Sequence, residues 1–360
     1  MSQFDKAVAH TIKHFELHRI GGLEWRVISD IEDGVVAITA VEEAVLRRFQ
    51  RLPGWPHTVV TFFVLQDLSA LQRQLQARDA AVHGGQMMLP AGGIAGLMQR
   101  PVVNLYDLAN PEACHIFINQ AAMVQARYWG DVQAETALLA HEHAHPLVEN
   151  ATVQASRQVS IAVQLSSHSP LSTTAHERWL ARLQEVARSL AERLCTFAPR
   201  ELFTNSLVIA AGFDDALCYL DRMTAARAVE GLPGRQALVA GLRAEDELTD
   251  AGRNVFLLLA DMQAHLEMAF EVAAFRWRGA VQCADALEQF LGAELFSLLT
   301  PEIRPIFAAL TRIYVGLPND LAPAQYADVV RSILAVVAEA LASYGVAMHS
   351  TVVTIAEKEG

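Results

Sequence analysis

The pattern of hydrophobic and polar positions predicts both strands and helices in the amino-terminal third of the chain. LEWRVIS (23–29) and HTVVTFFVLQD (57–67) are rich in β-branched and aromatic residues, as half-buried strands are. Between them, AVEEAVLRRFQRL (40–52) has apolar residues at helical spacing and ends before a Pro-Gly pair. The other elements expected here are a helix over 68–82 and two short strands, PVVNLYDL (101–108) and CHIFINQ (114–120).

The remainder of the chain has a helical pattern almost throughout. From residue 176 onward, segments 176–197 and 201–223 carry apolar residues at helical spacing, and about four further helices follow between proline-marked breaks. We therefore expect an α+β fold. Residues 1–150 are predicted to form an α+β subdomain with a small mixed sheet and a helix over the histidine-rich segment near residue 141, and residues 151–360 a mostly α-helical subdomain.

The balance of charge argues against a nucleic-acid partner. The 360 residues include 28 basic and 40 acidic side chains, which gives a formal net charge of −12. Phosphate backbones would be repelled unless a local basic patch existed, and no basic run is longer than Arg47-Arg48. We therefore expect no nucleic acid among the partners.

Cysteine usage and hydropathy indicate a soluble, cytoplasmic protein. The four cysteines are scattered without a C-x-x-C spacing, which suits a reducing compartment and offers no thiolate metal site. The first residues lack the apolar core and cleavage site of a signal peptide. Acidic residues or histidine interrupt the most apolar stretches, so no membrane span is expected.

One segment, ETALLAHEHAHPLVEN (135–150), holds three histidines within five positions and fits two incompatible structures. On a strand, the period of two would place His141, His143 and His145 on one face, as in a three-histidine metal cage. On a helix, His141 and His145 align one turn apart with Glu142 beside them, while His143 points away. The two structures predict different chemistry.

The residues before the histidines favour the helix. Gly130-Asp131 offers an N-cap, and AETALLA (134–140) is among the strongest helix-forming runs of the chain. Between Val132 and Ala144, the only β-branched residues are Val132 and Thr136, so a strand has little support. We predict a helix.

The helical spacing suits a catalytic zinc site. Histidines at positions i and i+4 project in parallel, about 6 Å apart, and their imidazoles can converge on one ion. A glutamate next to the first histidine can accept a proton from a metal-activated water and later pass it to the leaving amine. His141 and His145 are thus candidate Zn²⁺ ligands, and Glu142 is the candidate general base.

The run His141-Glu142-His143-Ala144-His145 resembles the H-E-x-x-H signature of the zincin metallopeptidases. The order of elements over roughly residues 20–150 is also similar to that family. The resemblance implies two histidine zinc ligands, a glutamate base and a peptide or protein substrate. It further implies that CHIFINQ (114–120) is the sheet edge along which an extended substrate pairs.

Two features depart from the family pattern. Pro146 directly follows the second histidine, so the helix is expected to end or kink there, sooner than in most zincins. The metzincin extension H-x-x-G-x-x-H is absent, because His145 is followed by PLVENATVQ. The similarity is therefore to gluzincins, in which a glutamate farther along the chain is the third ligand.

The third ligand must come from a second helix. Glu149 lies eight residues, about 12 Å, from His141 along a helix axis, too far to share one ion. Gluzincins with the wider E-x-x-x-D spacing are matched by Glu201-Leu202-Phe203-Thr204-Asn205, where Asn205 replaces the aspartate that orients a histidine. Glu201 is our first candidate. The alternatives are Asp214, Asp215, Glu177 and Glu185.

The other histidines have more ordinary interpretations. His143 is expected to be a buried or hydrogen-bonded structural residue. His10, His14 and His18, spaced i, i+4, i+8, are expected on a solvated helix face.

Three further features leave functional questions open. Candidate donors to an oxyanion are His168, His176 and Tyr219. The glycine-rich loop 84–96 matches no phosphate-binding pattern. The nearly apolar segment 253–277 predicts a buried bundle helix.

The sequence thus predicts a zinc-dependent peptidase in which Glu142 activates a water. Two alternatives stay open: a catalytically inactive zincin-fold regulator or scaffold, and a metal amidohydrolase that holds His141 and His143 on a strand. The substrate, the cleavage specificity and the oligomeric state are not predicted.

Overall fold

The computed structural model describes residues 11–72, 96, 98–106, 111–167, 169–245 and 247–355. The chain forms two compact units, Met1–Leu147 with Ala211–Leu220, and Val148–Ala210 with Asp221–Gly360. The amino-terminal part is α+β and the rest is mostly helical, so the predicted fold class is confirmed. One difference from the expected division is that residues 211–220 belong to the first unit.

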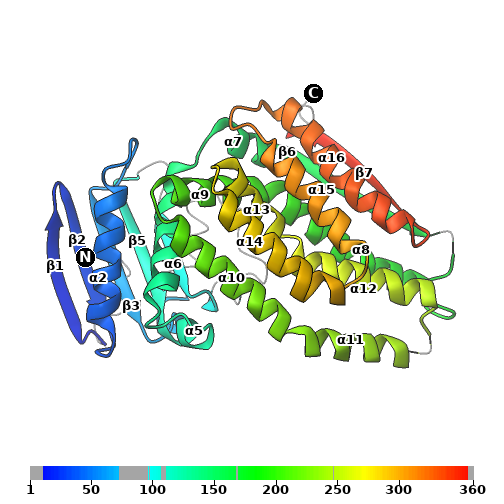
Figure 1. Ribbon diagram of the computed structural model, residues 1–360, viewed down its shortest axis with the longest axis horizontal. Helices are drawn as coiled ribbons and strands as arrows, with labels where there is room; N and C mark the ends of the chain where they lie inside the picture. The colour runs from blue at the N-terminus through cyan, green and yellow to red at the C-terminus, as the bar shows by residue number, and fades with distance from the viewer. Residues whose placement is uncertain are drawn as a thin grey trace. The chain divides into compact units, whose positions relative to one another are not determined.

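The first unit contains a five-stranded mixed sheet (Figure 1). Its strands are β1 (His14–Ile20), β2 (Leu23–Ser29), β3 (Val59–Leu65), β4 (Val102–Tyr106) and β5 (Ala113–Asn119). They lie in the order β1-β2-β3-β5-β4. The central strands β2, β3 and β5 are parallel, and β1 and β4 are antiparallel to their neighbours.

The central strand β3 forms because its side chains are almost all apolar on both faces. In β3 (VVTFFVL) every residue after Val59 is buried, which is typical of a parallel strand covered on both sides. Phe63 and Phe117 stack with ring centroids 4.7 Å apart on one face. Burying each such phenylalanine contributes about 2 kcal/mol. The cluster on that face comprises Ile28, Phe63, Leu65, Leu68, Leu71, Val103 and Phe117.

Two packed helices, α2 (Val35–Phe49) and α6 (Val132–Ala144), lie beside the sheet, and α6 carries the motif histidine His141 and Glu142 (Figure 1). Helix α2 packs against α6, and α6 also contacts β4. The short helix α5 (Gln120–Gln125) follows β5 directly, begun by the Asn119 side chain, which accepts a hydrogen bond from the Ala122 backbone. These packings fix α6 against the rigid part of the unit.

The prediction that residues 114–120 form the sheet edge is wrong. This segment is β5, which pairs with β3 on one side and β4 on the other. Both rows of its main-chain groups are therefore engaged in the sheet. Among the described strands, the edge on this side is β4.

The expected helix bearing His14 and His18 is also wrong, because residues 14–20 form strand β1. A separation of four residues places two side chains on the same face of a strand as well as of a helix. The half-buried and exposed positions of β1 alternate with a period of two. His10 lies outside the described residues.

The second unit is dominated by helices, most of which are labelled in Figure 1. They are α7 (Ala151–Arg157), α8 (His176–Glu192), α9 (Ala198–Ala210), α10 (Asp214–Glu230, shared with the first unit), α11 (Leu232–Ala244), α12 (Asp250–His265), α13 (Met268–Trp277), α14 (Val281–Phe290), α15 (Ile303–Val315) and α16 (Pro323–Ala342). The apolar segment 253–277 forms most of α12 and all of α13, and it is largely buried as predicted.

A two-stranded sheet was not predicted in this unit. Strand β6 (Val159–Ser167) pairs antiparallel with β7 (Val346–Thr354) over their full length. Helices α8 and α16 pack against this pair. The paired residues are almost two hundred positions apart in the chain, so local sequence patterns do not predict the pairing.

A π-helical segment, Arg193–Phe197, connects α8 to α9 without a break. Three consecutive carbonyls in it accept hydrogen bonds from side-chain hydroxyls. Tyr314 donates to Leu194 (2.8 Å), Tyr326 to Cys195, and Ser156 to Thr196 (3.4 Å). These bonds link the π segment to α15, α16 and α7 of the same unit.

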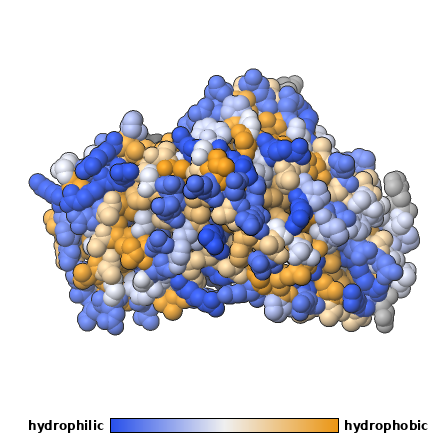
Figure 2. Space-filling view, viewed as in Figure 1, coloured by the Kyte–Doolittle hydropathy of each residue, from blue (hydrophilic) through white to orange (hydrophobic). Residues whose placement is uncertain are grey.

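The surface mixes hydrophilic and hydrophobic residues, and the face in Figure 2 shows hydrophobic ones in several separate groups. Within the described residues, none of the helices combines the length and hydropathy needed to cross a bilayer. The glycine-rich loop 84–96, apart from residue 96, and most of the predicted helix 68–82 lie outside the described residues.

Candidate metal centre

The motif segment is a helix, as predicted. Helix α6 begins at Asp131, whose carboxylate accepts hydrogen bonds from the backbone of Gln133 and Ala134, both at 3.1 Å. Glu135 accepts a further bond from the Gly130 backbone at 2.8 Å. An acid at the N-cap and a second in the first turn stabilise this helix end. The strand interpretation of the three histidines is therefore wrong.

His141 and His145 lie one turn apart, with ring centroids separated by 4.6 Å and planes at 86°. The α-helix ends at Ala144, and His145 opens a 3₁₀ turn that continues through Leu147. The change of winding occurs where Pro146 was expected to end the helix. His145 is buried and His141 is half-buried.

His143 projects to the opposite side of α6 and is fully buried, as predicted. Its Nε2 lies 2.8 Å from Oε1 of Glu42, a fully buried residue of α2. The ring of Trp55 lies between two imidazoles, 5.7 Å from His143 and 4.8 Å from His57. This cluster of aromatic and polar side chains packs on the face of α6 that carries His143, opposite His141 and His145.

His57 is the titratable group of the cluster most affected by its surroundings. The pKa of His57 is lowered to about 4, chiefly by burial and to a smaller extent by neighbouring His143, against a hydrogen bond to the Pro111 carbonyl that raises it. The imidazole is thus neutral at physiological pH. Burial also raises the pKa of the Cys114 thiol, and the Glu42 carboxylate adds to this shift.

Glu142 is half-buried and lies beside the edge strand. Its backbone carbonyl accepts a hydrogen bond of 2.7 Å from the side-chain amide of Asn104 on β4. The bond couples the motif helix to the sheet edge at the residue predicted to handle the proton.

Glu201 lies in the first turn of α9, four residues after the π segment. Within the described part of the chain, one group of three metal-ligating side chains has all its ligand atoms within 4.8 Å of one another: His141, His145 and Glu201. These are the three residues that were predicted from the sequence as Zn²⁺ ligands.

The alternative third ligands are placed elsewhere. Asp214 and Asp215 lie in the first turn of α10, and Glu177 and Glu185 are exposed on α8. None of the four belongs to the group formed by the described residues.

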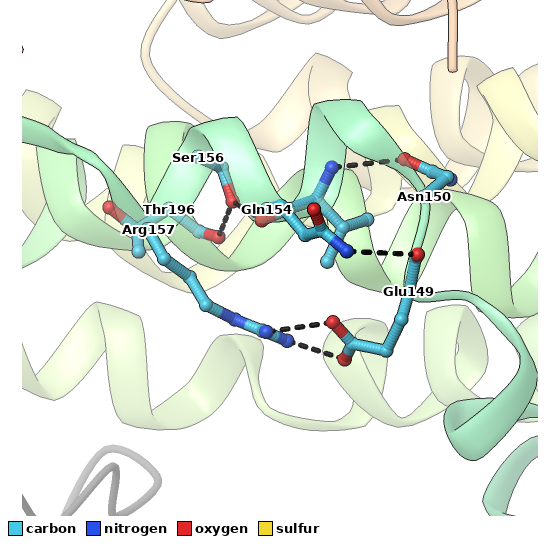
Figure 3. Close-up of polar contacts among 7 residues, drawn as sticks. Glu149, Asn150, Gln154, Ser156, Arg157 and Thr196 are labelled. Atoms are coloured by element: carbon cyan, nitrogen blue, oxygen red, sulfur yellow. Dashed lines mark hydrogen bonds and ion pairs between the residues drawn. The ribbon is translucent and has the colours of Figure 1, made fainter. Parts of the chain in front are cut away.

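Glu149 is held by an arginine (Figure 3). Its two carboxylate oxygens accept hydrogen bonds of 2.6 and 2.8 Å from Arg157. Asn150 caps α7 by accepting a bond from the Val153 backbone at 3.0 Å. A bidentate pair of this kind fixes the carboxylate in the second unit, so Glu149 makes a matched comparison for Glu201.

Two of the candidate oxyanion donors, Tyr219 and His176, have local structural partners. Tyr219 donates a hydrogen bond of 2.6 Å to Asp131, which raises the pKa of Tyr219 and supports the start of α6. His176 accepts one of 3.0 Å from the Leu171 backbone at the start of α8. Asn205 is buried on α9, and His168 lies outside the described residues.

No protein-family model, curated protein or solved structure matches this chain. The functional interpretation therefore depends on the site itself.

Sequence reasoning missed two residues that position the motif helix, Glu42 and Asn104. Glu42 had a detectable signal, because Val45, Leu46 and Phe49 follow it at i+3, i+4 and i+7 and mark its face as buried. An acid on a buried helix face requires a partner. Asn104 had no such signal, since its partner depends on the strand order.

Proposed function

We propose that this protein is a zinc-dependent hydrolase of the zincin type that cleaves peptide bonds. His141, His145 and Glu201 would hold the ion, and Glu142 would act as the general base. The observation that carries the proposal is the grouping of two imidazoles and one carboxylate with ligand atoms within 4.8 Å of one another.

The donor set fits a catalytic rather than a structural metal. Two histidines and one carboxylate are a ligand set of catalytic zinc, which leaves the fourth position open. When bound, Zn²⁺ supplies Lewis acidity that lowers the pKa of a coordinated water and polarises a carbonyl. Closed structural sites use four protein ligands, mostly cysteine, and no cysteine belongs to this group.

Two features support Glu142 as the general base of the proposed site. It neighbours His141 in the chain and is half-buried, so its carboxylate is partly shielded from water. In the proposed reaction it accepts a proton from the attacking water and delivers it to the leaving nitrogen. The hydrogen bond from Asn104 to its backbone carbonyl holds this residue's main chain against strand β4.

The edge strand β4 offers a surface for an extended peptide. The bond from the Asn119 amide to the Pro101 carbonyl sets the phase of the β4–β5 ladder. In an antiparallel pair with this phase, the main-chain N–H and C=O of Asn104 point away from β5. A substrate strand that pairs there would lie next to Glu142, which favours a peptide over a compact small molecule.

The cysteines fit an expected location in the cytoplasm. Cys114 and Cys195 are buried and form no disulfide. Thiols of this kind persist in a reducing compartment. We include a cytoplasmic location in the proposal on this basis.

Metal analysis and product analysis test the proposal together. The purified chain is expected to retain about one equivalent of zinc. It is also expected to cleave members of a mixed peptide pool, with products identified by mass spectrometry. Glu142→Gln should retain the metal and lose cleavage by at least about a hundredfold, while Glu149→Gln should leave both unchanged.

Each alternative outcome has a defined meaning. Metal retained with no cleavage in the wild type would favour a regulator or scaffold that keeps the zincin site. Absence of metal at micromolar zinc would contradict the proposal. Retention of cleavage in Glu142→Gln would remove that residue from its role.

A further inference from the structure

Strand β1 is an edge strand whose exposed face carries two large apolar side chains. It pairs with β2 alone among the described strands. Phe15 and Leu17 are 59% and 57% exposed, whereas Glu16 and His18, between and beyond them, face the other side and are half-buried. Large apolar side chains this exposed on an open edge favour contact with another protein surface.

The polar face of β1 is already ordered within the strand. The Glu16 carboxylate contacts His14 at 3.0 Å and His18 at 2.6 Å, and the His18 ring lies 4.7 Å from that of Trp25. The side chains on this face are thus held in defined positions before any partner binds.

The hairpin geometry decides which main-chain groups of β1 face outward. Gly21-Gly22 connects β1 to β2, with Ile20 opposite Leu23 and Gly21 at φ +60°. In a two-residue hairpin the closing pair exchanges both hydrogen bonds, and bonded and non-bonded pairs then alternate. The N–H and C=O groups of Phe15, Leu17 and Arg19 therefore point away from β2.

A bulge, proline and lysine, three features that commonly protect an edge, are missing from β1. The register with β2 is continuous from His14 to Ile20, so no bulge interrupts it. The strand HFELHRI contains neither proline nor lysine. Such an edge can accept another strand along its whole length.

We propose that β1 is the contact through which two copies of this chain pair, antiparallel, about a two-fold axis at Leu17. In this register Leu17 lies opposite itself, Phe15 opposite Arg19, and Glu16 opposite His18 of the second copy. The sequence is thus self-complementary: an apolar centre, two acid–imidazole pairs and two arginine–aromatic pairs.

The main-chain geometry agrees with this axis. The three residues with outward groups, Phe15, Leu17 and Arg19, become the hydrogen-bonded pairs across the interface. Glu16 and His18 become the non-hydrogen-bonded pairs, in which side chains approach most closely. An axis at Glu16 would also bond residues with outward groups, Phe15 with Leu17, but it would place two carboxylates directly opposite each other in a non-hydrogen-bonded pair, where like charges repel.

Sedimentation velocity over a concentration series up to roughly 100 μM tests the pairing, since weak interfaces dissociate in the micromolar range. The full chain should dimerise with concentration. Leu17→Lys places two ammonium groups across the axis and should raise the dimer dissociation constant at least about a hundredfold. Leu298→Lys, at a position 55% exposed, is the matched control and should leave it unchanged.

Exchanging the acid and the imidazole of β1 distinguishes a loss of the interface from a loss of folding. Glu16→His alone and His18→Glu alone each oppose like side chains and should weaken the dimer about tenfold or more. The double variant restores both pairs in reversed order and should recover most of the affinity. A chain that stays monomeric throughout, or a dimer indifferent to Leu17→Lys, would overturn the proposal.

Cross-linking gives a second, independent readout. Hydrogen-bonded antiparallel pairs have Cα atoms about 5.5 Å apart, within disulfide range. Leu17→Cys should therefore form a covalent dimer on mild oxidation, and Leu298→Cys should not. These outcomes do not depend on the metal or on the proposed hydrolysis.

Discussion

Glu42 of α2 and His143 of α6 share a hydrogen bond of 2.8 Å between two side chains that are both fully buried. His143 occupies the middle of the motif, about 200° around the helix from His141 and from His145. A bond that holds His143 toward α2 therefore turns the other two imidazoles the opposite way. The central residue of the motif sets the rotation of the helix that carries the candidate ligands.

Removing the Glu42 carboxylate should destabilise the protein strongly. Glu42→Ala leaves a buried imidazole without its partner, and we expect a loss of about 2–4 kcal/mol in the free energy of unfolding. Glu43→Ala removes the neighbouring exposed acid, which pairs with Arg47, and should cost about 0.5 kcal/mol or less. Urea unfolding followed by circular dichroism measures both. Equal losses would show that the buried pair contributes little.

Zinc affinity should depend on Glu201 and not on Glu149. Glu201→Gln replaces a carboxylate of the candidate site, and we expect the zinc dissociation constant to rise more than about a hundredfold, beyond the effect of residues that only support ligands. Glu149→Gln removes a carboxylate that Arg157 already holds and should change it less than about threefold. Competition with a chromophoric chelator measures both constants. A Glu201→Gln variant with wild-type affinity would exclude this residue as a ligand.

His57 should make the protein less stable in mild acid. Its pKa is lowered from 6.5 to about 4 in the folded state, chiefly by burial. The unfolded chain therefore takes up a proton, as pH falls from about 6.5 to 4, that the folded chain does not. The contribution of His57 to the free energy of unfolding is therefore most favourable above this pH range, and it decreases by about 3 kcal/mol as the pH falls across the range.

The comparison that isolates this contribution is His57→Asn, whose amide can still donate to the Pro111 carbonyl. The difference in urea midpoint between pH 7 and pH 4.5 should be smaller in this variant than in the wild type. His349→Gln alters an exposed histidine on β7 and should leave the difference unchanged. A wild-type pH profile in His57→Asn would contradict the assignment.

The tyrosine hydroxyls at the π segment should contribute measurably to stability. Tyr314→Phe leaves the buried Leu194 carbonyl without its side-chain donor, and Tyr326→Phe does the same at Cys195. We expect each change to cost about 1–2 kcal/mol in the free energy of unfolding. Chemical denaturation with an unchanged m-value measures the loss. Losses under about 0.3 kcal/mol would mean that other groups replace the hydroxyls.

The elements with strong local signals were predictable from the sequence. The α6 helix was indicated by its N-cap at Asp131 and by its alanine and leucine content, and both features appear in the structure. The strands at 23–29 and 59–65 followed from their β-branched and aromatic residues. In each case the local preference and the burial pattern agree.

The elements that escaped prediction depend on distant partners. Strand β1 reverses the usual pattern, since Phe15 and Leu17 are exposed while Glu16 is half-buried. Strand β7 follows α16 after one glycine turn, and its apolar residues continue the run of that helix. That β4 and not β5 is the edge strand follows from the order of the strands in the sheet. The spacing of residues within either strand does not determine that order.

The π segment contains one residue more than a regular α-helical turn, and this extra residue rotates the side chains that follow it about the helix axis. The helical run from His176 to Ala210 is continuous through residues 193–197. Each residue of an α-helix advances the winding by about 100°, so deleting one residue there would swing Glu201 around the helix axis by about that angle. The direction in which the Glu201 carboxylate points thus depends on one extra residue in the π segment. Side-chain hydroxyls from residues up to 131 positions away in the chain hydrogen-bond to that segment.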